Sequence, residues 1–421
     1  MNPRGPFKWS LFLVVFLLAA AVAVAAAQGA PDPAPPKAAP VITELGESAS
    51  PTAILTESEP NNDFASADAI QPGDVIAGKI RPAGDVDTFK FTVSEDGNPD
   101  YLFDIDAAVL GSPLDAYVCL YSDLYSLLAC NDDSDGWDSL LYRGLYPGDS
   151  YYIQVHELRD DEGGAAFTYR LAIYSPLFVS AATAGSVAGV AFRPEDVLAH
   201  YDFPDGTEKW LMFFDGSDVG ITRNVSGFAL YGYPYETILS FAFQANQPID
   251  GLGTVRPNNA VWFRPDNLGS YTAGANWRNL QIDELDAAGE KIDALGRSTN
   301  SGIYVSTTGA TSVTSRFGYV INARDEDLIS GWVYYDVFDS WEYLEFDGSQ
   351  VPGLAAEDVF AADYNGVWYL TILGSGVIDG HAYNQKDIFM VDSETYEVLG
   401  RYWHGPAHHF NYNLDAIDVS D

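Results

Sequence analysis

The amino-acid sequence predicts an all-β protein, in which a jelly-roll-like β-sandwich is followed by a β-propeller-like domain of about four repeats. Short runs between residues 57 and 176 alternate apolar and polar residues and are separated by turn residues, at a spacing typical of sandwich strands. From residue 194 onward, one strand-rich segment recurs four times. Because such units bury their apolar faces by stacking on their neighbours, we expect a blade-like domain over residues 177–421.

The composition favours a globular, strongly acidic protein. The chain has 421 residues, of which 60 are Asp or Glu and 21 are Lys or Arg, so the formal net charge is -39. A field of this sign repels phosphate backbones and anionic membrane surfaces and attracts cations. We therefore expect no nucleic-acid partner. The charge also favours solubility outside the cell.

Residues 1–28 have the pattern of a secretory signal peptide, in which Arg4 and Lys8 precede an uncharged apolar run of 19 residues that ends among small residues. An uncleaved N-terminal anchor is the alternative, because this run is long. Residues 29–56 are rich in Pro and Ala and are expected to form an extended linker. We expect a secreted or extracytoplasmic cell-surface protein, with no integral membrane domain beyond this signal or anchor.

The two cysteines, Cys119 and Cys130, lie in two β-like runs that are separated by a predicted turn. Paired strands bring Cα atoms to about 5 Å, which is within disulfide range. In an exported chain the spacing therefore predicts a Cys119–Cys130 disulfide. Two small buried thiols are the alternative.

Several motifs in residues 57–176 follow one another in a characteristic order: ESEPNNDFASADAI, GDVDTFKFTV, SPLDAYVCLY, LLACNDDSDGWDSLL and LYPGDSYYIQV. From end to end, this order resembles the bacterial pre-peptidase C-terminal (PPC) domain. The resemblance implies a jelly-roll-like sandwich that accompanies secreted peptidases and other exported proteins. Relatives of this domain in collagenases bind collagen and hold calcium.

Acidic and amide side chains gather in these motifs, and calcium takes six to eight hard oxygen ligands of this kind. In the calcium-holding relatives the ligands come partly from the opening segment, which Glu59, Asn61 and Asp63 match. The alternative is that these residues cap turns, since Asp and Asn bond their own backbone there. The calcium ligands are sought among Glu59, Asn61, Asp63, Asp85, Asp87, Asp132, Asp133 and Asp135, with Glu57 and Asn62 beside them.

The four repeats share an opening Asp or Asn, a tryptophan and a turn rich in Asp and Gly. Each unit of about 60 residues contains about four strands, as a blade would. The last unit ends without its fourth strand, and we expect the run VAGVAF near Val187 to supply it and to join the ends of the domain. The opening residues are Asp196, Asn259, Asp327 and Asp387, and the tryptophans are Trp210, Trp277, Trp341 and Trp403.

Two features of the repeats have a functional and a structural interpretation. The tryptophans are expected to pack within or between blades, because recurrence at one position is what packing requires. Asp215, Asp218, Asp293 and Asp347 are expected to shape β-turns, with an axial ring of cation ligands as the alternative. The motif FDGSDVG in the first unit resembles repeats of uncharacterised secreted bacterial proteins. This resemblance implies no activity.

The motif HGPAHH holds three of the six histidines, His404, His408 and His409. A transition-metal site would need them to converge with supporting groups. In a turn that contains Gly and Pro they are instead expected to be exposed to solvent.

The sequence contains no G-x-S-x-G, H-E-x-x-H, P-loop or dinucleotide-binding pattern, and we predict no catalytic or cofactor-binding residue apart from the calcium ligands. We expect a secreted or cell-surface, non-catalytic binding or scaffold protein. Its partner would be an extracellular glycan, a protein or cell-envelope material. The alternative is a secreted, glycosidase-like hydrolase with paired carboxylates at the propeller axis.

Overall fold

We analysed a computed structural model of the chain. The predicted signal peptide, residues 1–28, and most of the predicted linker, residues 29–56, lie outside the described residues. In the part of the chain that is described, no helix is long and apolar enough to cross a membrane. The structure describes residues 54–95, 100–134, 136–203, 206–282, 285, 289–298, 302–334 and 337–419.

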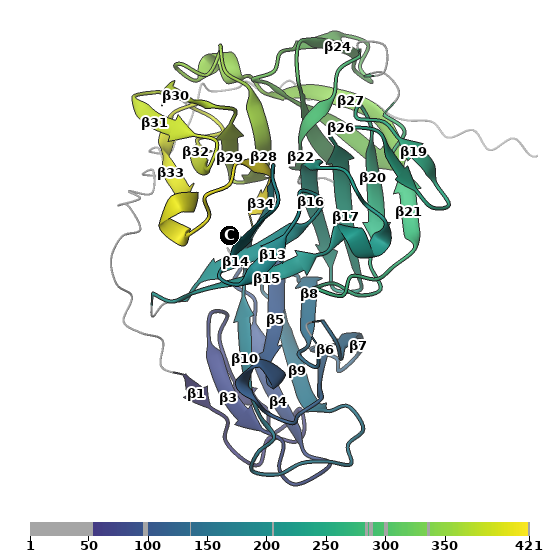
Figure 1. Cartoon of the computed structure of the whole chain (residues 1–421), viewed down its shortest axis with the longest axis vertical. Coiled ribbons are helices and arrows are strands. Elements are labelled where there is room, and N and C mark those ends of the chain that lie inside the picture. The colour runs from purple at the N-terminus through teal and green to yellow at the C-terminus, as the bar shows by residue number, and fades with distance from the viewer. Residues whose placement is uncertain are drawn as a thin grey trace, which may run out of the picture. The chain divides into compact units, whose positions relative to one another are not determined.

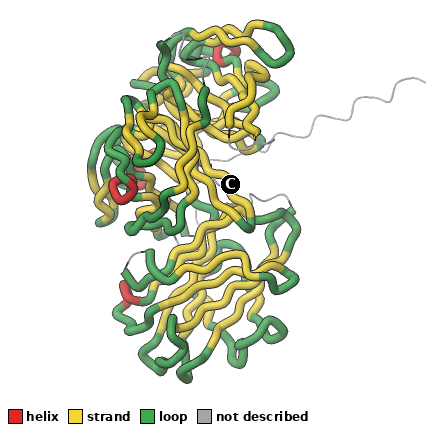
Figure 2. Tube along the Cα trace, turned by 90° about the vertical axis from the view of Figure 1, so that its right-hand side faces the viewer, coloured by secondary structure: helices red, strands yellow, loops and turns green. Residues whose placement is uncertain are grey.

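The regular secondary structure of the described chain consists almost wholly of strands, joined by loops and a few short 3₁₀ turns, which confirms the all-β prediction (Figure 2). Two five-stranded sheets form the N-terminal part. One has the order β1 (Leu55–Thr56), β3 (Val75–Lys79), β10 (Thr168–Tyr174), β5 (Asp100–Asp106), β8 (Leu140–Gly144). The other has the order β2 (Asp68–Ala69), β4 (Val86–Thr92), β9 (Ser150–Glu157), β6 (Ala116–Ser122), β7 (Leu127–Asn131).

The two sheets share one apolar core. Phe89 and Phe91 alternate along β4 with exposed or polar residues, so one face of this strand is apolar. They join Phe103 and Leu171 of the opposite sheet in a single buried cluster. The sheets therefore form a β-sandwich.

The remaining described strands form four four-stranded sheets and four two-stranded hairpins (Figure 1). The first contains β34 (Leu414–Val419), β11 (Leu177–Ala181), β14 (Val197–Asp202) and β15 (Glu208–Phe214). The second contains β16 (Val225–Tyr233), β17 (Glu236–Phe243), β20 (Ala260–Arg264) and β21 (Asn276–Asn279). The third contains β22 (Ile292–Ser298), β23 (Gly302–Thr307), β26 (Leu328–Tyr334) and β27 (Val337–Phe346). The fourth contains β28 (Val359–Asn365), β29 (Val367–Ile372), β32 (Asp387–Val391) and β33 (Val398–His404).

Each of the four sheets shares buried apolar clusters with two others. One cluster joins the first and second sheets, and others join the second to the third and the third to the fourth. A further cluster joins the fourth sheet back to the first, with Trp210 and Trp403 inside it. The strands β16, β22, β28 and β34 also contact one another in this cyclic order. The repeats thus stack on their neighbours, as the sequence predicts.

The two ends of this region meet in the first sheet, but not through the strand that the sequence suggested. The C-terminal strand β34 pairs with β11, from Leu177↔Val419 to Ala181↔Leu414. The run VAGVAF instead belongs to a separate hairpin of β12 (Gly185–Val187) and β13 (Val190–Phe192). Positive φ angles at Ala188 and Gly189 turn the chain between these two strands, so the run cannot continue as one strand.

The predicted disulfide is present. Cys119 on β6 lies directly opposite Cys130 on β7, with their Cα atoms 4.1 Å apart and their sulfurs bonded. Three of the four repeated tryptophans, Trp210, Trp341 and Trp403, are buried, and Trp277 is half-buried against Phe263. The tryptophans therefore pack between or within sheets, as expected.

Candidate functional site

A cluster of three carboxylates lies where the chain enters the sandwich. Glu57 and Glu59 come from the segment between β1 and β2, and Asp87 lies on β4. Each residue offers one oxygen that lies within 4.8 Å of the other two. The hydroxyl of Tyr169 on β10 donates to Asp87 Oδ2 at 2.7 Å and to Glu57 Oε2 at 3.4 Å. One phenol thus holds two of the acids together.

Two side chains of this region have buried oxygens without a hydrogen-bond partner among the described residues. They are Asp87 Oδ1 and Asn61 Oδ1, and both residues are fully buried. Burial, and then the neighbouring Glu57, raise the pKa of Asp87 to about 9, while burial and Asp85 raise the pKa of Glu59. A bound cation would remove both the repulsion and the unsatisfied oxygens. The donors are all hard oxygens, which fits Ca²⁺.

Other predicted calcium ligands of the same segments hold the backbone. Asp85 Oδ2 accepts from the Arg81 amide at 2.7 Å, and Asp85 Oδ1 accepts from Asn62 Nδ2 at 2.6 Å. Asp63 Oδ1 accepts from the amide and the hydroxyl of Ser66, and these bonds lower the pKa of Asp63. Such bonds are those of turn-capping acids.

The second predicted acidic motif contributes nothing to the three-carboxylate cluster in the described residues. Asp132 is half-buried and Asp133 is exposed, and Asp135 lies outside the described residues. Burial and Asp132 raise the pKa of Asp133. The next acid along the chain, Asp138, instead accepts hydrogen bonds from three successive backbone amides, those of residues 107–109.

Three of the four repeated aspartates, Asp215, Asp218 and Asp347, lie at turns as the sequence predicts, whereas Asp293 is buried within β22, so the turn prediction is wrong for it. Asp215 and Asp347 each accept from the backbone amide two residues later, at 3.0 and 3.1 Å, and so begin a short 3₁₀ turn. Asp196 and Asp327 each bind the glycine amide of that turn, at 3.0 and 2.9 Å. At Gly348 an added Cβ would lie 2.2 Å from the Glu326 carbonyl oxygen, so only glycine fits.

Carboxylates also lie where β16, β22, β28 and β34 meet, as the hydrolase alternative requires. Asp363 accepts from the Tyr304 hydroxyl at 2.9 Å and from the Val419 amide at 2.7 Å. Asp418 accepts from the Leu230 amide at 2.8 Å. Both carboxylates are buried, and burial raises the pKa of each. These bonds fit a structural role.

The three histidines of HGPAHH do not share one partner, because His404 contacts Asp387 whereas His408 and His409 contact Glu208. The ring of His404 bonds to the buried Asp387 through Nδ1 at 2.5 Å, and the side chain of His409 is 82% exposed. His408 is only partly exposed and faces Asp202 and Glu208, so the expectation of an exposed side chain is wrong for it. No motif in the sequence predicts this contact, because Asp202 and Glu208 lie about 200 positions earlier in the chain.

An exposed aromatic cluster, which we define as Phe317, Tyr319 and Tyr343, lies on the third sheet and the hairpin beside it. The Phe317 ring is 6.3 Å from Tyr319 at an interplanar angle of 7°, and 5.5 Å from Tyr343 at 32°. The guanidinium of Arg316 covers Phe317 at 4.9 Å. All three rings are more than two-fifths exposed. Exposed apolar groups that gather in this way are typical of interaction surfaces.

A search of family models and a search of curated proteins find no match to this chain. Among solved structures, the pre-peptidase C-terminal domain of a collagenase from Bacillus anthracis is similar at 18% identity and a TM-score of 0.21, over 25% of this chain and 93% of that one. The BSP domain of a biofilm-associated protein is similar at 10% identity and a TM-score of 0.14, over 81% of this chain and 68% of that one. Neither similarity is close enough to assign a function to this chain.

Proposed function

We propose that the protein is a secreted or surface-held, non-catalytic binding protein with a PPC-type, jelly-roll-like sandwich and a four-bladed β-propeller. The cyclic contacts of β16, β22, β28 and β34 support the propeller. The first blade would be completed by the C-terminal strand β34, which pairs with β11. The basic and apolar residues 1–28 support export.

The exposed aromatic cluster supports binding most directly. The three rings are partly exposed. Because they already pack against one another, they should lose little side-chain conformational entropy when a ligand binds. The polar groups that contact the cluster are the Arg316 guanidinium over Phe317 and the Tyr319 hydroxyl, which donates to the Glu342 carbonyl oxygen at 2.6 Å. Apolar ring faces beside such polar groups suit an extracellular glycan, whose sugar rings present both kinds of surface. A glycan is therefore favoured over a protein or other cell-envelope material.

Binding is tested by co-sedimentation of the full chain with insoluble polysaccharides, collagen and cell envelopes. We expect retention on a polysaccharide that Phe317→Ala combined with Tyr343→Ala reduces at least about tenfold, since each exposed ring contributes about 1 kcal/mol or more. The matched control is Tyr235→Ala, which removes an exposed ring from the turn between β16 and β17. Equal loss in the control, or retention unchanged in the double variant, would exclude the aromatic cluster as the binding surface.

The sandwich is proposed to hold a structural calcium ion. Glu57, Glu59 and Asp87 would supply carboxylate oxygens and Asn61 an amide oxygen, because these groups include the buried, unpartnered oxygens. The ion would neutralise the cluster and fix the opening segment on β4.

Calcium is therefore expected to raise the melting temperature of the full chain above its value in chelator. Asp87→Asn and Glu59→Gln should abolish this increase, whereas Asp133→Asn, the matched control at an exposed acid, should retain it. A melting temperature that is the same with calcium and with chelator would exclude the ion. Scanning calorimetry of the four proteins gives the comparison.

A further inference from the structure

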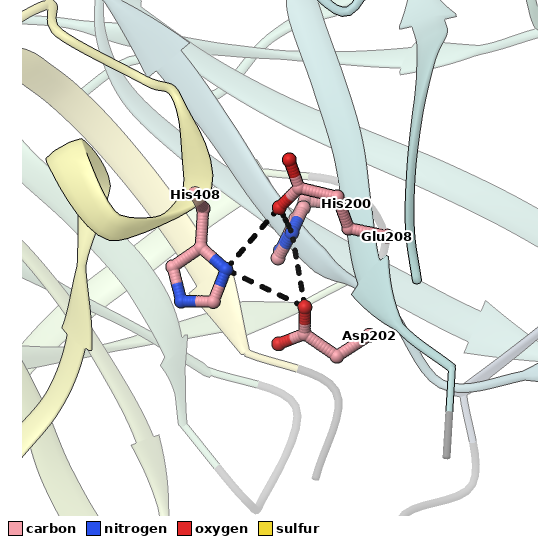
Figure 3. Close-up of side chains that lie close together, drawn as sticks. All are labelled: His200, Asp202, Glu208 and His408. Atoms are coloured by element: carbon pink, nitrogen blue, oxygen red, sulfur yellow. Dashed lines mark hydrogen bonds and ion pairs between the residues drawn. The ribbon is translucent and has the colours of Figure 1, made fainter. Parts of the chain in front are cut away.

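Four metal-ligating side chains converge at the boundary between the first and fourth sheets (Figure 3). His200 and Asp202 are two positions apart on β14, so their side chains lie on one face of the strand. Glu208 begins β15 and is paired with Asp202 across the hairpin. His408 ends the 3₁₀ turn η5 (Gly405–His408), which follows β33 of the fourth sheet. Three donors thus come from one hairpin and the fourth from the other end of the chain.

The four nitrogen–oxygen distances are close to the edge length of a zinc-centred tetrahedron, and all four donor atoms lie within 4.8 Å of one another. His200 Nε2 lies 3.3 Å from Glu208 Oε2 and 3.6 Å from Asp202 Oδ1. His408 Nδ1 lies 3.4 Å from each of the same two oxygens. Zinc bonds of 2.0–2.1 Å in tetrahedral geometry place neighbouring ligand atoms about 3.3 to 3.4 Å apart. Charge-assisted hydrogen bonds would be shorter, at about 2.7 to 2.9 Å.

The charges around these donors also favour a cation. Asp202 and Glu208 lie directly opposite each other on paired strands, where like charges destabilise a sheet. Among the described residues, the only side chains that form ion pairs with these two acids are His200, His408 and His409. No ion pair joins either acid to a described Lys or Arg. A divalent ion between the carboxylates would offset their repulsion.

The surroundings fix the two imidazoles and leave a route to them. His200 is only 2% exposed, and its ring lies 4.4 Å from that of Trp210. The His408 ring stacks on Trp403 at 5.5 Å and an interplanar angle of 10°. Both histidines and Asp202 line a cavity of about 490 Å³, through which an ion can reach the donors.

We propose that His200, Asp202, Glu208 and His408 form a structural site for Zn²⁺ that fastens the first sheet to the fourth. Two imidazole and two carboxylate donors suit zinc, whereas calcium needs six to eight oxygens. Four protein ligands fill a tetrahedron and leave no position for a substrate, so the site is structural and not catalytic. The ion would bridge residues 208 positions apart, 200 and 408, at the place where the two ends of the repeat region meet.

The test is metal binding by the full chain after treatment with a chelator and dialysis. We expect one Zn²⁺ per chain at this site, a melting temperature that rises with Zn²⁺, and a Co²⁺ derivative with the intense visible absorption of four-coordinate cobalt. His408→Ala and Asp202→Asn should each weaken Zn²⁺ binding by roughly a hundredfold or more and remove the cobalt absorption. Asp202→Asn keeps the side-chain shape at a partly exposed position, so it separates metal loss from misfolding.

The matched control is His381→Ala, which removes an exposed histidine from β31 (His381–Asn384), in the hairpin between β29 and β32. It should bind zinc like the unaltered chain. Zinc binding that survives both ligand variants, or that falls equally in the control, would show adventitious binding to surface histidines and overturn the proposal. So would a chain that binds Ca²⁺ at these residues but not Zn²⁺. Circular dichroism of the metal-free variants confirms that each is folded.

Discussion

Asp415 is a buried carboxylate on β34 whose ionisation opposes folding. Its Oδ2 accepts hydrogen bonds from the side-chain amides of Asn224 and Gln244, the latter at 3.2 Å, while Oδ1 has no partner among the described residues. Burial raises its pKa to about 7, although the bond from Asn224 lowers it. The folded protein therefore keeps the proton of this group over a range in which the unfolded chain, with a pKa of about 3.9, has lost it.

The sign of the pH dependence follows from this difference. Between about pH 4 and pH 7 the folded state binds more protons than the unfolded state, so this group lowers the free energy of unfolding as the pH rises. Asp415→Asn should remove this loss, because its amide oxygen can accept from both donors and it carries no charge. We expect the variant to be more stable than the unaltered chain at pH 8 by up to about 4 kcal/mol, and the gain to vanish near pH 4.

Urea unfolding at several pH values measures this difference, with Glu345→Gln at an exposed position as the control for a change in net charge. An Asp415→Asn gain that is the same at pH 4 and pH 8 would contradict the pKa argument.

At single residues, the sequence predicts chemistry where the ligands are close in the chain. The motifs predict Glu59 and Asp87 as calcium ligands, and both residues lie in the three-carboxylate cluster. Asp63 belongs to the same motif, but its carboxylate binds the turn at Ser66. No motif marks His200, because it is the only histidine of an apolar run and its partner His408 is 208 positions away. Only the pairing of sheets brings such donors together.

At the scale of the strands and sheets, Trp341 on β27 shows what the repeated tryptophans do. Its side chain is 1% exposed and lies 4.7 Å from the Phe338 ring, in the cluster that joins the second and third sheets. Trp341→Ala would leave a cavity between two sheets and should lower the free energy of unfolding by about 3 to 5 kcal/mol. Trp137, which is 55% exposed, provides the matched control, and Trp137→Ala should cost under about 1 kcal/mol.

Chemical denaturation of both tryptophan variants gives the comparison. Equal, small losses for Trp341→Ala and Trp137→Ala would mean that the second and third sheets do not rely on this contact. A large loss for Trp341→Ala alone is the result that inter-sheet packing requires.

The repeats in the sequence predict where the strands lie better than they predict which strands pair. Alternation and the recurring Trp and Asp mark where the strands of each unit lie, because both are set within a few residues. The strand that closes the first sheet could not be chosen in this way. Both the run at Val187 and the run at Leu414 are short and apolar. A turn with positive φ at Ala188 divides the first of them, and an Ala followed by a Gly is not a clear turn signal in the sequence.

At the scale of the whole molecule, the sandwich and the first two sheets of the repeats share one apolar core. Leu102 and Tyr142 of the sandwich belong to the same buried cluster as Phe178 and Phe213 of the first sheet. The rings of Tyr142 and Phe213 lie 5.5 Å apart. The described residues of both parts also belong to one compact unit. A core that crosses from one part to the other should make them unfold together.

An ion-pair group crosses the same junction. Lys209 on β15 binds the carboxylates of Asp104 and Asp106 on β5, the latter at 2.8 Å. Burial alone would lower the pKa of Lys209, but the two carboxylates outweigh it and raise that pKa. Lys209 therefore stays charged at neutral pH and is the cationic partner of the buried Asp104, which also accepts a hydrogen bond from the Tyr174 hydroxyl at 3.2 Å.

We expect Lys209→Met to lower the free energy of unfolding by about 3 kcal/mol, because it leaves the Asp104 carboxylate buried without its cation. Adding Asp104→Asn should restore part of this loss, since it removes the uncompensated charge. Asp106→Asn is the matched control and should cost less, because Asp106 is more exposed and Lys209 keeps its bond to Asp104.

Hydrogen exchange tests whether the sandwich and the repeats unfold together. Amides of β5 and of β14 should report the same opening free energy in the unaltered chain, and both values should fall together in Lys209→Met. Separate values for the two strands, with only one affected by the substitution, would mean that the sandwich and the repeats unfold independently despite their shared core.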